Sequence, residues 1–344
     1  NISNQIKTTI FNASTFYMKR KAFSIALLFC IISLLVYGWG FFAHKRINKI
    51  AVFTLPSQLM RFYKINIDFI EEHAVDPDKR RYAVKEEAAR HYIDLDRYGE
   101  SPLDSLPKNW KAAVEKYTKD TLMAHGIVPW HINVMLGRLT EAFRNKDYNK
   151  ILRYSADLGH YIADAHVPLH CTQNYNGQLT NQVGIHGFWE SRVPELFADN
   201  YDYFVGKAQV IEKPMDYIWE IIRQSFAAKD SVLLFEKELN AKFDTDRKYA
   251  FEQRGTNMTR VYSVDYSKQY EEMLNGMVER RMRQAIIAVG SFWLTAWTNA
   301  GQPNLDGIEK IVVSDEMKKE IEAEDQMWRT GKVLSPGGHT DDDH

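Results

Sequence analysis

The chain has 344 residues, of which 45% are hydrophobic and 26% are charged, and its formal net charge is −1 at pH 7. This is the composition of an ordinary globular protein with enough apolar residues for a large core. A nearly neutral chain has no general attraction for a polyanion, which argues against a protein that binds duplex DNA or RNA through a basic face.

The first 38 residues do not resemble part of a fold. Residues 1–17 contain no acidic residue and precede the first methionine, so we set them aside as an upstream segment. Residues 18–38 have the pattern of a secretory signal peptide, with a basic start at 19–21, an apolar run and a small residue, Gly38, at the end. Cleavage after Gly38 would make Trp39 the amino terminus and would remove Lys7, Lys19, Arg20 and Lys21, so that the net charge becomes −1 − 4 = −5.

An uncleaved membrane anchor is the alternative, because the apolar run continues to Ala43 and reaches the ~20 residues that a spanning helix needs. The protein is thus expected to be exported, either released or anchored at a membrane surface. Cleavage would also remove Cys30 and leave Cys171 alone, so the exported chain could form no internal disulfide.

Helical periodicity dominates the rest of the chain. We expect helices over residues 41–55, 57–73, 110–123, 130–145, 151–165, 214–229, 231–243 and 273–299, and a long irregular loop over 74–99 around Pro77. Strand patterns are nearly absent, so the sequence predicts an all-α fold with a single domain over residues 39–310. The charged tail, 311–344, is expected to start as a helix and then to be disordered, with His339 and His344 as adventitious metal binders.

The segment 160–190 carries the chemistry. It contains His160, Asp164, His170, His186 and Glu190. Residues four apart lie on one face of a helix, so the pairs His160/Asp164 and His186/Glu190 can each close on one metal ion. A catalytic zinc site uses three protein ligands, and five are too many for one ion. The segment therefore predicts a cluster of metal ions.

With other residues this segment resembles the zinc-dependent phospholipase C and S1/P1 nuclease superfamily, an all-helical family that holds three zinc ions. The resemblance follows the order Trp39, His44, Asp76, His91, His160, Asp164, His170, His186 and Glu190. It implies one zinc bound by Asp76, His91, His160 and Asp164. It implies a second bound by the amino group and carbonyl of Trp39, by His44 and by a bridging Asp164, and a third bound by His170, His186 and Glu190.

Two of these assignments depend on further arguments. A free α-amine has a pKa of ~7.7–8.0 and loses its proton easily to bind zinc, whereas an uncleaved amide would not serve, so cleavage before Trp39 would switch the enzyme on. Asp94 and Asp96 compete with Asp76 for the loop carboxylate. We prefer Asp76 because it precedes His91 by fifteen residues, as in the S1/P1 nucleases.

The resemblance implies hydrolysis of a phosphodiester. Three zinc ions would bring six positive charges against three carboxylates, those of Asp76, Asp164 and Glu190, and the surplus would attract a phosphate. A zinc-bound hydroxide would attack phosphorus. Lys79 or Arg80, three or four residues after Asp76, is expected to face the phosphate, as an arginine does in the S1/P1 nucleases.

The sequence has features of two substrate classes. Glu190 resembles the phospholipases C, whereas the run at 91–94 and Trp189 resemble the nucleases. We favour a phospholipase C-like enzyme acting on a phospholipid head group. The alternative is a single-strand nuclease, in which Tyr92 or Phe188 would stack an unpaired base. A further alternative is a membrane-anchored protein whose zinc is only structural.

Overall fold

The computed structural model describes residues 40–255, 257–334 and 339. The upstream segment, the signal peptide and Trp39 lie outside these residues, so the expectations for them stay predictions. The described residues divide into a larger unit, within 40–249 and 262–339, and a smaller one, within 250–261.

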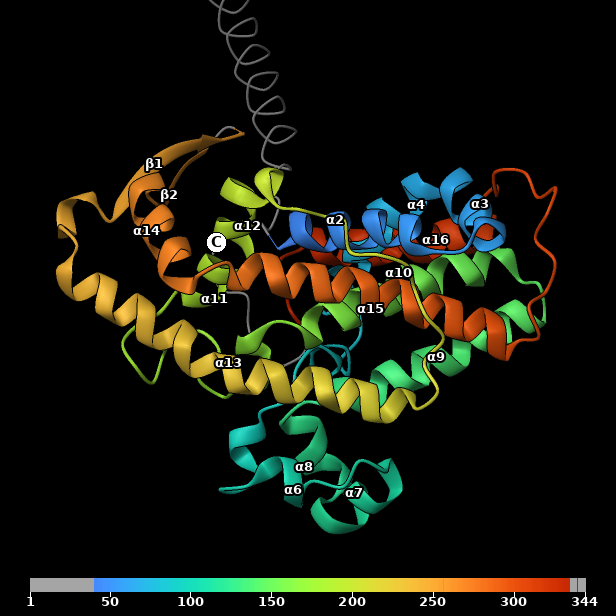
Figure 1. The fold of residues 1–344 in the computed structure, drawn as a ribbon, viewed down its shortest axis with the longest axis horizontal. Coiled ribbons are helices and arrows are strands. Elements are labelled where there is room, and N and C mark those ends of the chain that lie inside the picture. Colours follow the sequence, from blue (N-terminus) through green and yellow to red (C-terminus); the bar gives the residue numbers. More distant parts are fainter. Residues whose placement is uncertain (1–39, 256, 335–338, 340–344) are drawn as a thin grey trace, which may run out of the picture. The chain divides into compact units, whose positions relative to one another are not determined.

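The larger unit is built from helices, as the sequence predicts (Figure 1). They are α2 (Phe41–Ala51), α3 (Ser57–Ile65), α4 (Ile67–Glu72), α5 (Asp76–Arg80), α6 (Pro102–Ser105), α7 (Trp110–Tyr117), α8 (Lys119–Ala124), α9 (Val128–Arg144), α10 (Tyr148–Ala165), α11 (Ile185–Gly187), α12 (Val193–Phe197), α13 (Pro214–Lys242), α14 (Val264–Leu274), α15 (Met277–Asn299) and α16 (Asp315–Arg329). Within the described ranges, no helix combines the length and the apolar character that crossing a bilayer requires. The all-α class is confirmed.

Several elements differ from the expectation. Residues 57–73 and 110–123, each expected as one helix, are interrupted at Asn66 and Thr118, and α14 was not expected. Strands β1 (Tyr249–Arg254) and β2 (Asn257–Tyr262) form a two-stranded sheet that the sequence analysis missed. Residues 214–243, expected as two helices, form the one continuous helix α13, because no proline or glycine interrupts them after Pro214.

Helix α10 lies at the centre of the larger unit. It packs against α9, α15 and α2, and α9 also contacts α13 and α15 (Figure 1). The Trp293 indole of α15 donates a hydrogen bond to the Ser155 carbonyl at 3.0 Å and stacks on Tyr63 at 4.7 Å between ring centroids. Because neighbours surround it, α10 presents its polar side chains from a rigid, buried support.

Two glycines allow helices to approach closely. A Cβ at Gly159 of α10 would overlap the side-chain amide of Asn48 in α2, and one at Gly290 of α15 would overlap the Thr54 hydroxyl. The Asn48 amide uses this proximity to donate a hydrogen bond to the Ala156 carbonyl at 3.0 Å. Gly159 therefore sets the distance between α2 and α10, the two helices that carry the first site residues.

Helix α16 joins the fold through partly buried ion pairs, so the charged tail begins as the predicted helix. Glu324 pairs with Arg80 Nε at 3.1 Å and with Arg153 at 2.5 Å. Asp325 pairs with Lys79 Nζ at 3.2 Å. These contacts attach α16 to α5 and α10, which both border the site.

Candidate metal centre

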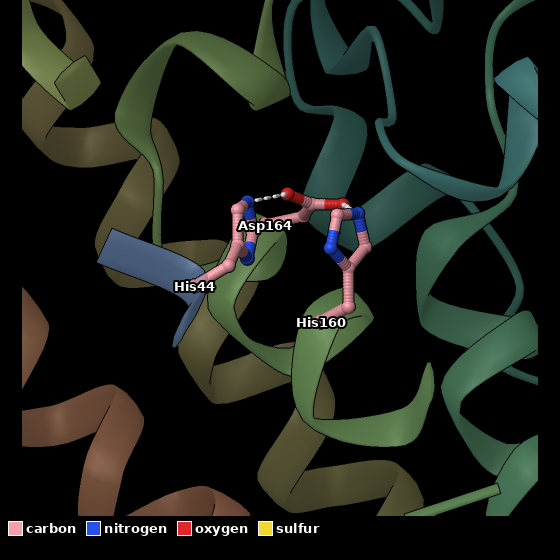
Figure 2. A group of neighbouring side chains, drawn as sticks. All are labelled: His44, His160 and Asp164. Carbon is pink, nitrogen blue, oxygen red and sulfur yellow. Dashed lines mark ion pairs between the residues drawn. The ribbon is translucent and has the colours of Figure 1, made fainter. Parts of the chain in front are cut away.

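Asp164 lies between two sets of ligands. His160 and Asp164 project from α10 and are almost completely buried. One carboxylate oxygen, Oδ2, lies 3.2 Å from His160 Nε2 and 3.0 Å from His91 Nδ1. The other, Oδ1, lies 3.4 Å from His44 Nε2, as Figure 2 shows. One carboxylate thus faces His44 with one oxygen and His91 and His160 with the other.

His44, His160 and Asp164 form the first group whose ligand atoms all lie within 4.8 Å of one another. The His44 ring, presented by α2, stacks on the His160 ring with 4.0 Å between centroids (Figure 2). This close stacking depends on the short distance between α2 and α10.

Asp78, His91 and His160 form a second such group. Asp78 Oδ1 lies 3.4 Å from His160 Nε2 and 3.6 Å from His91 Nδ1. The His160 Nε2 atom is itself 3.1 Å from His91 Nδ1. His160 therefore belongs to both groups, and the two groups are contiguous.

The structure brings Asp78, and not the predicted Asp76, into this group. Asp76 instead accepts a hydrogen bond from His73 at 2.8 Å and pairs with Arg153 at 3.4 Å. Residues two apart on a helix point about 200° apart, so the short helix α5 cannot turn both carboxylates to the same histidines. The fifteen-residue spacing between Asp76 and His91 does not show in which direction each carboxylate of α5 points.

A third group consists of His170, His186 and Glu190. Glu190 reaches His170 Nε2 at 3.3 Å with one oxygen and His186 Nε2 at 3.2 Å with the other. A π-helical turn, Phe188–Arg192, follows α11 and carries Glu190. The Asn176 side chain accepts the backbone N–H groups of Gly184 and His186, at 2.8 and 3.4 Å, and so fixes the turn before His186.

Hydrogen bonds at the outer nitrogens orient two of the histidines. His160 Nδ1–H donates to the Ala74 carbonyl at 2.8 Å, and His170 Nδ1–H donates to the His91 carbonyl at 2.7 Å. A histidine that donates from Nδ1 presents the Nε2 lone pair, which is the form that ligates metal. The tautomers of both rings therefore suit zinc.

Burial and neighbouring charge oppose each other in this cluster. Burial alone would lower the pKa of His160, but the carboxylates of Asp164 and Asp78 outweigh it and hold the pKa well above its ordinary value. The same competition, with Asp164 and Glu190 as the carboxylates, raises the pKa of His170 to about 9. Burial and the neighbouring His160 lower the pKa of His44 to about 4. Without metal, protons at His160 and His170 balance the buried carboxylates.

Lys79 and Arg80, expected to face a phosphate, are turned away from these groups. Lys79 pairs with Asp325, and Arg80 makes a bidentate contact with Asp157 at 3.0 and 3.1 Å. Phe188, a suggested base-stacking residue, is buried against Tyr262 at 3.9 Å between centroids. These side chains serve the core and the α16 contact.

Sequence reasoning missed Asp78 and Arg81. Arg81 stands three residues after Asp78, at the spacing expected for the phosphate-facing arginine. The residue three positions after Asp76 is a lysine, Lys79. That signal could have selected Asp78. It also makes Arg81, whose guanidinium donates a hydrogen bond to the His339 carbonyl, the better candidate for contact with a phosphate.

His339 is buried, which differs from the expectation of a disordered tail at this position. Its ring lies between the rings of Tyr92 and Tyr175, and its Nε2 bonds Asp94 at 2.8 Å. Nothing in the local sequence around this histidine indicates such a contact, because it depends on residues about 160 to 250 positions away.

The comparison with known families agrees with the ligand pattern. Residues 43–252, more than half of the chain, match the family described as zinc dependent phospholipase C, within the S1/P1 nuclease-like superfamily. No curated protein is similar enough to the chain to count as a match. The chain belongs to the zinc-dependent phospholipase C family and is accordingly a zinc-dependent phosphoric diester hydrolase.

Proposed function

We propose that the protein is an exported phospholipase C-like phosphodiesterase that holds three zinc ions. The observation that carries the proposal is the presence of three ligand groups, each with its nitrogen and oxygen atoms within 4.8 Å of one another. Imidazole and carboxylate are the ligands that zinc takes in catalytic sites. The outward Nδ1–H bonds of His160 and His170 support the fit, because both leave Nε2 directed at the cluster.

The ligand sets follow from the three groups. Asp78, His91, His160 and Asp164 would hold one zinc, and His170, His186 and Glu190 would hold another. His44 and Asp164 would hold the remaining ion. The rest of its ligands would come from the amino group and carbonyl of Trp39, which lies outside the described residues.

Bound zinc would supply Lewis acidity, a lowered pKa for coordinated water and a net positive charge. The protein's own contribution is positioning. Asp164 places two ligand groups on opposite oxygens of one carboxylate, and Glu190 holds the two imidazoles of the third group. Arg81 offers a guanidinium suited to a phosphate oxygen.

A single-strand nuclease remains the second candidate because of one observation. The Tyr92 and Tyr175 rings lie on opposite sides of a flat ring, at 4.0 and 4.1 Å between centroids, and Asp94 accepts a hydrogen bond from that ring. A slot of this width with an acceptor at its edge could take an unpaired base, since every base offers a flat face.

Zinc-loaded protein beginning at Trp39 tests the proposal when it is offered phosphatidylcholine micelles and single-stranded DNA in parallel. Release of phosphocholine and about three zinc ions per chain are the expected results. Release of 5′-nucleotides without phosphocholine would favour the nuclease. Zinc without hydrolysis of either substrate would favour a structural metal.

Export and processing form a separate part of the proposal. If residues 18–38 are removed, the mass of the protein recovered from the expressing cells should correspond to a chain that starts at Trp39. A retained apolar segment would indicate an anchor instead, and would leave the His44 ion without an amine ligand.

A further inference from the structure

His339 is seated in an aromatic slot. Its side chain is 4% exposed, and its ring is nearly parallel to the rings of Tyr92 and Tyr175, with interplanar angles of 16° and 12°. A ring stacked on both faces loses most of its contact with water, which is the usual arrangement for a bound ligand ring.

Two polar groups of the same residue are also bound, while its ring Nδ1 is buried without a hydrogen-bond partner. The ring Nε2–H donates to Asp94 Oδ1 at 2.8 Å, and the backbone carbonyl accepts a hydrogen bond from Arg81. Two aromatic faces, one carboxylate and one guanidinium thus meet a single residue.

The slot borders the metal centre. The His339 ring centroid lies 5.8 Å from that of His170 and 6.4 Å from that of His186, two residues of the third ligand group. Tyr92 directly follows His91 of the second group. A phosphodiester that reached the metal ions and Arg81 would therefore have to share this space with His339.

Helix α16 keeps the tail near the site. Its ion pairs through Glu324 and Asp325 attach it to α5 and α10. Only ten residues lead from Arg329, the last residue of α16, to His339. A covalent connection this short keeps His339 at a high local concentration near the slot.

We propose that His339 is an autoinhibitory ligand, which occupies the slot of Tyr92 and Tyr175 and competes with substrate for Arg81. The inference rests on the proposed function, because it assigns the slot to the substrate path of the same site. It identifies the occupant as this chain's own residue. The tail's release must precede substrate binding.

Steady-state kinetics on the zinc-loaded chain give the first test. His339→Ala, and separately a chain that ends at Gly331, should lower KM without raising kcat. A slot occupied about 90% of the time raises the apparent KM about tenfold, so the variants should lower it by about that factor. His344→Ala is the matched control from the same tail and should leave KM unchanged.

A peptide of residues 332–344 should inhibit the chain that ends at Gly331 competitively, and the same peptide with His339→Ala should not. Equal KM values for the full chain, His339→Ala and His344→Ala would overturn the inference. A fall in kcat with His339→Ala would do the same, because it would assign a direct contribution to turnover.

A second readout does not need activity. In full-length protein with isotope-labelled histidine, the two tyrosine rings should shift the His339 ring protons upfield, and Tyr175→Ala should return them towards the position of an exposed histidine. If this shift is present but no phosphodiester is hydrolysed, the proposed function fails and the docking stands. If hydrolysis is robust and the shift is absent, the autoinhibitory contact fails.

Discussion

At the scale of single residues, Asp164 connects two sets of candidate metal ligands. Its two oxygens face different histidines, with His44 on one side and His91 and His160 on the other. Burial would raise its pKa, but the surrounding histidines, His160 foremost, hold the pKa well below its ordinary value. The side chain is therefore an anion with both oxygens committed to the cluster.

Asp164→Asn should cost two metal ions, whereas Glu190→Gln should cost one. The amide is a poor zinc ligand, and Asp164 contributes to two of the proposed ions while Glu190 contributes to one. Zinc counted by mass spectrometry on desalted protein should fall accordingly in the two variants. Equal, single losses from both would contradict the shared carboxylate.

Asp78→Asn and Asp76→Asn distinguish the ligand from its neighbour. Asp78→Asn should remove one zinc and lower kcat/KM at least about 100-fold, since it alters a proposed direct ligand. Asp76→Asn should keep the zinc content and lower the free energy of unfolding by about 1–3 kcal/mol, because buried Arg153 loses a charged partner. Zinc analysis and urea unfolding check both. The reverse pattern would restore Asp76 as the ligand.

The raised pKa of Glu271, a residue outside the three ligand groups, predicts that the stability of the protein depends on pH. Burial is the main cause that raises its pKa from 4.5 to about 7. Because the folded-state value is the higher one, the folded protein keeps a proton that the unfolded chain has lost, and stability falls as pH rises from 4.5 through 7.

Glu271→Gln should therefore raise the free energy of unfolding at pH 8 by about 1–3 kcal/mol. The amide can still accept the hydrogen bond that the Tyr201 hydroxyl now donates at 2.8 Å. Unfolding by urea at pH 5 and pH 8 measures the effect. A variant with the wild-type stability at both pH values would refute it.

At the scale of elements, the contact between α2 and α10 connects packing to chemistry. Gly159 leaves room for Asn48, and the same approach stacks His44 on His160. The sequence alone does not show this, because a glycine in a strong helical pattern indicates only a locally weak helix former. The role of Gly159 follows from its contact with the facing helix, α2.

Gly159→Ala should force α2 away from α10, lower the free energy of unfolding by about 1–3 kcal/mol and weaken zinc retention at His44. Gly137→Ala is the matched control. That glycine lies in α9 with open space around it, so alanine should raise stability by up to about 1 kcal/mol. Thermal unfolding and zinc content measure both. A stabilised Gly159→Ala variant would show that the close approach is dispensable.

Strong periodicity predicted the long helices and the pairs His160/Asp164 and His186/Glu190, because helical spacing determines which face a residue takes. The orientation of short α5 was not predictable in the same way. One turn has no periodic pattern, and the choice between Asp76 and Asp78 depends on tertiary contacts with Arg153 and His73. The contacts of His339 could not be predicted for a similar reason, since the residues that it contacts are distant in the sequence.

At the scale of the whole molecule, the metal centre joins elements that are far apart in sequence. Its candidate ligands come from α2, α5, the loop around His91, α10 and residues 168–190. The buried carboxylates among them need positive charge in every state of the protein, whether from metal or from protons. Metal binding and folding are therefore coupled.

Removal of zinc by a chelator at pH 7.5 should lower the melting temperature by about 10–20 °C. Zinc added back should restore it in proportion to the logarithm of the free ion concentration. Calorimetry with buffered zinc measures the shift, and calcium serves as the control ion. An unchanged melting temperature in metal-free protein would separate the fold from the metal centre.

The position of α16 in the sequence determines when, during synthesis, its ion pairs with α5 and α10 can form. Glu324 is 244 residues beyond Arg80 and 171 beyond Arg153, yet it pairs with both. A nascent chain lacks this carboxylate until synthesis has passed residue 324, well after Glu190, the last residue of the three ligand groups. All the candidate ligands among the described residues are therefore made before the ion pairs that attach α5 and α10 to α16 can form.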